Sequence, residues 1–80
     1  MIRVLIADDH PLLRSGLKQI LSLESDIEVV GEAGDGQEAV SKAMQLRPDV
    51  LVLDINMPKM NGIEATRWLA DRLPETKIIV

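Results

Sequence analysis

The sequence predicts an α/β fold built on a doubly wound parallel sheet. Four short apolar runs alternate with three segments in which apolar residues recur at helical spacing, and the connections between them are short. The resulting order βαβαβαβ favours parallel strands joined by right-handed crossovers. Residues 50–53 are four consecutive aliphatics, as in a strand that is buried on both faces. We expect the chain to end inside the fourth strand, while the pattern alone leaves open which strands are neighbours in the sheet.

Composition limits the classes of protein to which this chain can belong. Eighty residues correspond to one domain, and the absence of cysteine excludes disulfide frameworks, thiolate zinc sites and cysteine nucleophiles. A net charge of −4 with scattered basic residues argues against direct contact with nucleic acid. Because every apolar run is short, we expect neither a membrane span nor a signal peptide, and we expect a cytoplasmic protein.

The first strand is predicted over 2–7 and runs directly into two acids, Asp8 and Asp9. A helix then begins at Pro11, because proline is favoured at the first helical position, where its missing N–H is not needed. Apolar residues at positions i, i+4, i+7 and i+8 predict one buried face that packs on the sheet. These residues are Leu13, Leu17, Ile20 and Leu21.

The second strand is predicted over 27–30, with glycines from Gly31 onward allowing it to end in a tight loop. Asp35 is expected to cap the second helix, and Glu38 stands three residues on, as in a capping box. Pro48 stops this helix. Its stripe of small apolar residues, suited to close packing on a sheet, consists of Ala39, Val40, Ala43 and Met44.

The third helix follows a loop, and Asn61 with Glu64 offers another cap at its start. Pro74 marks its end, and the fourth strand is predicted over 77–80. Trp68 falls opposite the apolar side of this helix, so we expect it to be largely exposed. The side predicted to face the core comprises Ile63, Thr66, Leu69, Ala70 and Leu73.

Acids follow two of the predicted strands. Asp8 and Asp9 come after the first, and Asp54 comes after the third. Because the carboxyl ends of parallel strands lie along one edge of a sheet, these three carboxylates share one pocket if the two strands are neighbours. Their mutual repulsion calls for a cation, and Mg²⁺ with oxygen ligands suits such a site. An ion there would hold a phosphoryl group against Asp54, a nucleophile that would become an aspartyl phosphate.

The same acids also have a purely structural interpretation. Acids at strand ends are ordinary loop residues and helix caps, and Asp9 stands two residues before Pro11, where it could cap the helix. His10, the single histidine, is interpreted as a capping or loop residue rather than as a base. The combination of Asp-Asp after one strand with Asp-x-Asn-x-Pro after another favours the functional interpretation.

Three stretches of the chain closely resemble the receiver domain of bacterial two-component response regulators. The Ala-Asp-Asp-His-Pro motif is similar to that of the NarL/LuxR-type subfamily of transcriptional regulators. The resemblance covers the whole chain and implies a flavodoxin-like doubly wound sheet with the strand order 2-1-3-4, incomplete at the C-terminus. The stretches are VLIADDHP at 4–11, VGEAGDG at 30–36 and PDVLVLDINMPKMNG at 48–62.

The resemblance also implies the roles of the acidic residues. Asp54 would accept a phosphoryl group from a sensor histidine kinase. Asp9, Asp54 and the backbone carbonyl at Asn56 would be Mg²⁺ ligands, and Asp8 would support the ion through water. The resemblance further implies that 1–80 is a partial receiver domain. Control of transcription would then pass through a DNA-binding output domain outside this chain.

Compared with the family, the sequence stops early. A Ser or Thr hydroxyl and a Lys that the family uses around the phosphoryl group would lie beyond Val80. The apolar edge at 77–80 is expected to favour self-association between copies of the chain. The receiver interpretation describes a switch rather than an enzyme, with at most weak self-phosphorylation and autodephosphorylation.

Two other functions stay open at this point. A phosphatase that uses Asp54 as its nucleophile would need, as in the haloacid dehalogenase family, a general acid two residues later, and here that residue is Asn56. The other alternative is an inert or self-associating scaffold fragment of the same fold.

Overall fold

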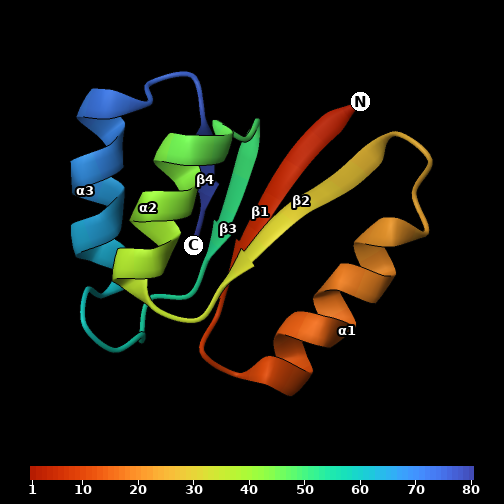
Figure 1. Ribbon diagram of the computed structural model, residues 1–80, viewed down its shortest axis with the longest axis horizontal. Helices are drawn as coiled ribbons and strands as arrows, with labels where there is room; N and C mark the ends of the chain where they lie inside the picture. The colour runs from red at the N-terminus through yellow and green to blue at the C-terminus, as the bar shows by residue number, and fades with distance from the viewer.

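A computed structural model describes all residues, 1–80, as a four-stranded sheet with three helices (Figure 1). The strand order is β2-β1-β3-β4 and every pair is parallel, which confirms the predicted topology. Helices α2 and α3 lie together on one face of the sheet, and α1 lies on the other (Figure 1). The elements are β1 (Ile2–Ala7), α1 (Pro11–Ser22), β2 (Ile27–Ala33), α2 (Gly36–Leu46), β3 (Val50–Leu53), α3 (Gly62–Arg72) and β4 (Lys77–Ile79).

The main core lies between the two central strands, β1 and β3, and the helices α2 and α3. Three leucines are almost completely buried there, namely Leu5 of β1 and Leu51 and Leu53 of β3. Burying a leucine side chain stabilises a fold by roughly 1.5–3 kcal/mol, so these three are major contributors. The helices present mainly small side chains to them, including Ala39 and Ala65, which allows close packing on the sheet.

Both N-caps predicted from the sequence are present. The N–H of Glu38 donates to Oδ1 of Asp35 at 2.8 Å, and the N–H of Glu64 donates to Oδ1 of Asn61 at 3.0 Å. Each cap satisfies one of the N–H groups that a helix start leaves without a partner. The Glu38 carboxylate reaches one residue further back than in an ordinary capping box, because it accepts from the N–H of Gly34 at 2.6 Å.

The predicted burial of the α1 face was wrong. No residue of α1 is fully buried, and Leu13 and Ile20 are 56% and 63% exposed. The reason is that α1 packs mainly against β2, at the edge of the sheet. Beside it, a cavity of about 330 Å³ opens toward β1 and β3 and is bordered by Leu13 and Leu17.

The predicted end of the second strand also needs correction. The second strand continues through Gly31 to Ala33 because it follows β1 past a bulge, where Val4 pairs with Val29 but Leu5 pairs with Gly31.

The orientation of α3 also differs from the prediction. Ala65 is buried while Ile63 and Ala70 are exposed, since the small Ala65 side chain lets the helix approach the sheet. Trp68 is half-buried against the core instead of largely exposed, and the Arg72 guanidinium lies 3.7 Å from the centre of its ring.

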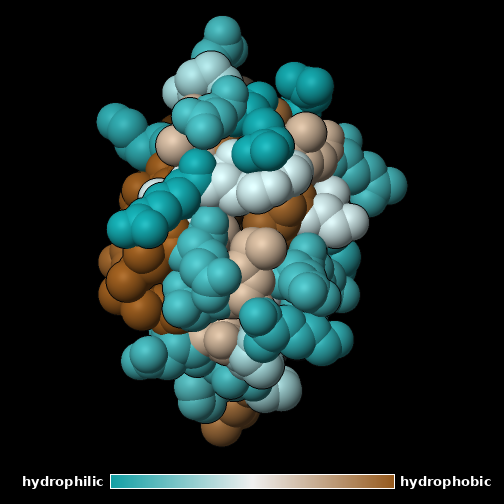
Figure 2. Space-filling view, turned by 90° about the vertical axis from the view of Figure 1, so that its left-hand side faces the viewer, coloured by the Kyte–Doolittle hydropathy of each residue, from teal (hydrophilic) through white to brown (hydrophobic).

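The face formed by α2 and α3 is mainly hydrophilic, with apolar surface gathered along one margin (Figure 2). No helix combines the length and the apolar character that crossing a bilayer requires. β4 pairs only with β3, and Ile79 is 51% exposed. Self-association through this strand stays a prediction.

Candidate metal centre

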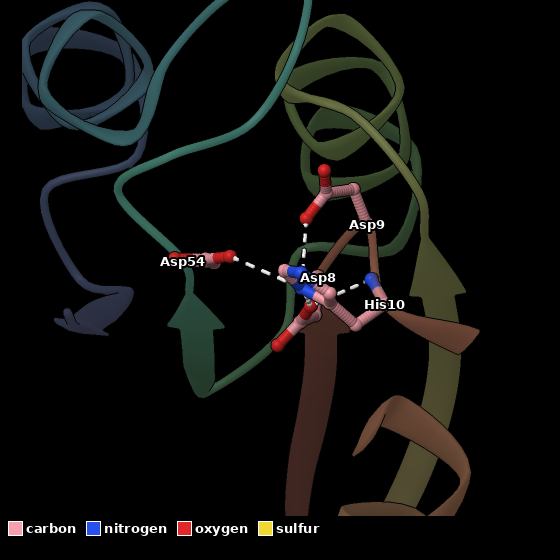
Figure 3. A group of neighbouring side chains, drawn as sticks. All are labelled: Asp8, Asp9, His10 and Asp54. Atoms are coloured by element: carbon pink, nitrogen blue, oxygen red, sulfur yellow. Dashed lines mark hydrogen bonds and ion pairs between the residues drawn. The ribbon is translucent and has the colours of Figure 1, made fainter. Parts of the chain in front are cut away.

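Four titratable side chains meet where the two central strands end (Figure 3). Asp8, Asp9 and His10 come from the turn after β1, and Asp54 directly follows β3. The N–H of Asp54 donates to the carbonyl of Ala7 at 3.0 Å, so the pairing of the strands continues into the site. One potential ligand atom from each of the four lies within 4.8 Å of all the others. The structure therefore brings the three predicted acids together.

Asp8 is the most buried of the four residues, and a backbone hydrogen bond holds its carboxylate in place. Only 6% of the residue is exposed, and its Oδ1 accepts the backbone N–H of His10 at 2.8 Å. Asp9 does not cap α1, because His10 stands at the N-cap position and no side chain caps that helix. The structural interpretation of Asp9 as a helix cap was therefore wrong.

The imidazole of His10 lies among the carboxylates, which sequence reasoning missed. Its Nδ1 is 2.9 Å from Oδ1 of Asp8, 3.0 Å from Oδ1 of Asp9 and 3.9 Å from Oδ2 of Asp54 (Figure 3). The hydrogen bond to Asp8 and the negative charge of Asp9 raise the pKa of His10 above its ordinary value. The sequence feature that could have indicated this placement is the position of His10 directly after two acids at a strand end.

Asn56 is exposed, and its contact with the site is through the backbone. Its N–H donates to Oδ1 of Asp54 at 3.2 Å, which leaves Oδ2 as the oxygen that faces His10. The role expected for the carbonyl of Asn56 as a metal ligand stays a prediction.

A second residue that sequence reasoning missed, Arg14 of α1, ties the acid-bearing turn to the sheet. Its guanidinium donates to the carbonyl of Asp8 at 2.6 Å and to Oε1 of Glu32, at the end of β2, at 3.2 Å. Lys18 also pairs with Glu32, at 3.3 Å, but it contacts neither acid of the turn. Arg14 thus fixes the backbone from which Asp8 and Asp9 project.

The cluster suits a small divalent cation. Oδ1 of Asp9 is buried and has no hydrogen-bond donor of its own. Its polar neighbour is Nδ1 of His10, and the single hydrogen that this nitrogen can carry is engaged by Asp8. A buried anionic oxygen without a donor is costly, and a hard cation bound by Asp8, Asp9 and Asp54 would remove that cost.

The fold and this cluster define an open parallel α/β domain with a group of acids at the carboxyl ends of its central strands. The model of the response regulator receiver domain family matches residues 4–80, and the chain belongs to this family. The family, the NarL/LuxR-type likeness and the flavodoxin-like fold are confirmed by the comparisons with known proteins.

Three similar proteins illustrate the match. The chain is 49% identical over 79 residues to the transcriptional regulatory protein DegU of Brevibacillus brevis, covering 99% of this chain and 34% of DegU. It is 47% identical to the response regulator domain of Thermotoga maritima CheB, with a TM-score of 0.93 over 98% of this chain and 57% of that one. The receiver domain of the putative response regulator NarL from Mycobacterium tuberculosis gives 40% identity and a TM-score of 0.85, over 96% and 60%.

The chain spans only 34–38% of the length of the first curated relatives that it matches. The names of those relatives therefore describe proteins that extend well beyond the part compared.

Proposed function

We propose that this protein is a phosphoacceptor switch of two-component signalling in which Asp54 receives a phosphoryl group from a sensor histidine kinase. Membership of the receiver family supports a signalling role rather than an enzymatic one. The observation that carries the proposal is the convergence of Asp8 and Asp9 with Asp54 at one edge of the sheet. The phosphatase and the inert scaffold are not favoured.

The exposures of the acids suggest different tasks. The side chain of Asp8 is 9% exposed, whereas that of Asp54 is 26% exposed and can be reached by a phosphoryl donor. Oδ1 of Asp54 is held by the N–H of Asn56, so Oδ2 is the oxygen proposed to attack phosphorus. A bond forms between this oxygen and phosphorus, while the bond from phosphorus to the donor nitrogen breaks.

Mg²⁺ is the proposed cofactor, with Asp8, Asp9, Asp54 and the carbonyl of Asn56 as the residues that would hold it. When bound, the ion would neutralise the phosphoryl oxygens and the neighbouring carboxylates. The chain contributes by holding these oxygens close together where β1 and β3 end. Asn56 stands two residues after the nucleophile. Its side-chain amide can neither give a proton to a leaving group nor take one from water, which favours a retained phosphoryl group over turnover.

The proposal is tested by incubating the purified protein with a small-molecule phosphoryl donor and Mg²⁺ and measuring its intact mass. We expect one phosphoryl adduct that is lost in Asp54→Asn and retained in Asp71→Asn, a control acid on the exposed side of α3. Continuous phosphate release would instead support the phosphatase. A folded protein that forms no adduct would support the inert scaffold.

Control of transcription belongs to the same proposal, since DegU is named a transcriptional regulatory protein. DNA contact would be made by segments outside 1–80, because this domain carries a net charge of −4. Weak self-phosphorylation and autodephosphorylation are proposed as the only chemistry of the domain alone. The cytoplasmic location stays a prediction.

A further inference from the structure

The loop between β3 and α3 passes beside the start of α2 and makes a sharp turn there (Figure 1). Lys59 has a φ of 70°, in the left-handed region that residues with a side chain rarely adopt. Around it, the N–H of Met60 donates to the carbonyl of Pro58 at 2.9 Å, which closes a turn of only three residues. Such turns with a positive φ at the centre are rare and strained. Contacts outside the turn therefore have to hold it in this shape.

The start of α2 supplies these contacts. The N–H of Gly36, the first residue of α2, donates to the carbonyl of Pro58 at 3.4 Å. The carbonyl of Met60 lies so close to Gly36 that a Cβ on this glycine would be 1.5 Å from its oxygen. Nζ of Lys59 also lies 3.5 Å from Oδ2 of Asp35, but this ion pair is exposed and contributes little. Only glycine at the start of α2 leaves room for the turn.

The same loop carries Asn56 next to the acids. Asp54 is tied to the sheet, because its N–H donates to the carbonyl of Ala7 at 3.0 Å. Asn56 has no bond to the sheet, and its N–H donates to Oδ1 of Asp54 at 3.2 Å. The side chain of Met57 is buried in the core, so the loop is anchored on the far side of Asn56 and again at α2. The direction of the Asn56 carbonyl thus depends on how the rest of the loop is held.

We propose that Gly36 is a positioning residue for the cation site: it holds the turn at 58–60 and thereby keeps the carbonyl of Asn56 directed at the ion. This inference rests on the proposed function, since it needs a cation bound at Asp54. Gly36 itself would not contact the ion. Groups that orient metal ligands without touching the metal matter, because loss of one usually costs about 10–100-fold in affinity.

Two substitutions of Lys59 test the shape of the turn without altering α2. The side chain of Lys59 is 61% exposed, so both variants should fold. Lys59→Pro fixes φ near about −65° and opens the turn, whereas Lys59→Gly removes the same side chain but adopts a positive φ freely. In calorimetric titrations we expect Lys59→Pro to bind Mg²⁺ about tenfold more weakly and Lys59→Gly to bind it like the wild type. Equal losses in both variants would assign the effect to the lysine side chain and overturn the proposal.

Gly36→Ala tests the contact at α2. Its methyl group would displace the carbonyl of Met60, so we expect Mg²⁺ affinity to fall about tenfold. The control is Ala70→Gly, which destabilises α3 at an exposed position far along the chain from the loop and should bind Mg²⁺ normally. Urea unfolding without metal measures the stability of both variants. A Gly36→Ala protein that is destabilised but binds Mg²⁺ like the wild type would leave Gly36 a purely structural role and overturn the proposal.

The outcomes separate this inference from the proposed function. If Asp54→Asn leaves Mg²⁺ affinity unchanged, the cation site itself is refuted. If Asp54→Asn loses affinity while Lys59→Pro and Gly36→Ala keep it, only the positioning role is refuted. At saturating Mg²⁺ we expect Lys59→Pro to be phosphorylated at the wild-type rate, because Asp54 stays tied to the sheet. A rate that stays low would show that the loop acts on Asp54 instead, which also overturns the inference.

Discussion

Replacing Gly62 with alanine should disturb the phosphoacceptor through the backbone. Gly62 is the first residue of α3, and its N–H donates to the carbonyl of Ile55 at 2.9 Å. A Cβ at this position would lie 2.7 Å from the carbonyl oxygen of Asp54 and 2.7 Å from Cα of Ile55. Both atoms belong to the backbone and cannot rotate away. The segment that carries Asp54 would therefore have to move by roughly 0.5–0.8 Å to restore ordinary contact.

Two opposing effects set the magnitude. Alanine gains up to about 1 kcal/mol over glycine in a helix, whereas overpacking costs about 1–3 kcal/mol. We expect a net loss of about 1 kcal/mol in the free energy of unfolding. Displacing a reacting group by about 1 Å can cost about 100-fold in rate, so a shift of half that size should slow phosphorylation of Asp54 by about tenfold.

Gly16 in the middle of α1 provides the matched control, because a Cβ built there meets nothing within 4 Å apart from its chain neighbours and the backbone of its own helix. Gly16→Ala should raise the free energy of unfolding by about 0.5–1 kcal/mol and leave phosphorylation unchanged. Urea unfolding followed by circular dichroism and the rate of adduct formation by intact mass measure the two effects. A Gly62→Ala protein that is stabilised like Gly16→Ala and phosphorylated at the wild-type rate would refute the reasoning.

Two further predictions concern charges. Arg14→Gln should lower the free energy of unfolding by about 1.5–3 kcal/mol, because the carbonyl of Asp8 loses a charged hydrogen-bond donor. Lys18→Gln removes only an exposed ion pair and should lower it by about 0–1 kcal/mol. Equal losses in urea unfolding would argue against a special role for Arg14. The pKa of Asp35 is lowered mainly by the N–H of Glu38. Its ionised form therefore stabilises the fold above pH 3.8, and this contribution is lost as the pH falls through the lower folded pKa. Thermal melts of Asp35→Asn should show a shallower loss of stability in this acidic range, and an unchanged slope would contradict the assignment.

The local features of this protein were readable from its sequence. The element order, the two caps at Asp35 and Asn61 and the placement of acids after β1 and β3 were all predicted correctly. Each depends on neighbours within a few residues, such as helical periodicity, a cap three residues before its N–H, or an acid after an apolar run. The strand order followed from the resemblance to receiver domains, since patterning alone left open which strands are adjacent.

Only the tertiary structure decided which surfaces are covered and which distant groups meet. Periodicity marks an apolar stripe on α1, but it does not say that the helix lies over β2 and leaves Leu13 exposed. It also could not place Nδ1 of His10 among three carboxylates, or Arg14 on the carbonyl of Asp8. These contacts depend on the pairing of β1 with β3 and on the angle at which α1 crosses the sheet. Such distances are set by packing between segments far apart in the chain, for which a single sequence carries no local signal.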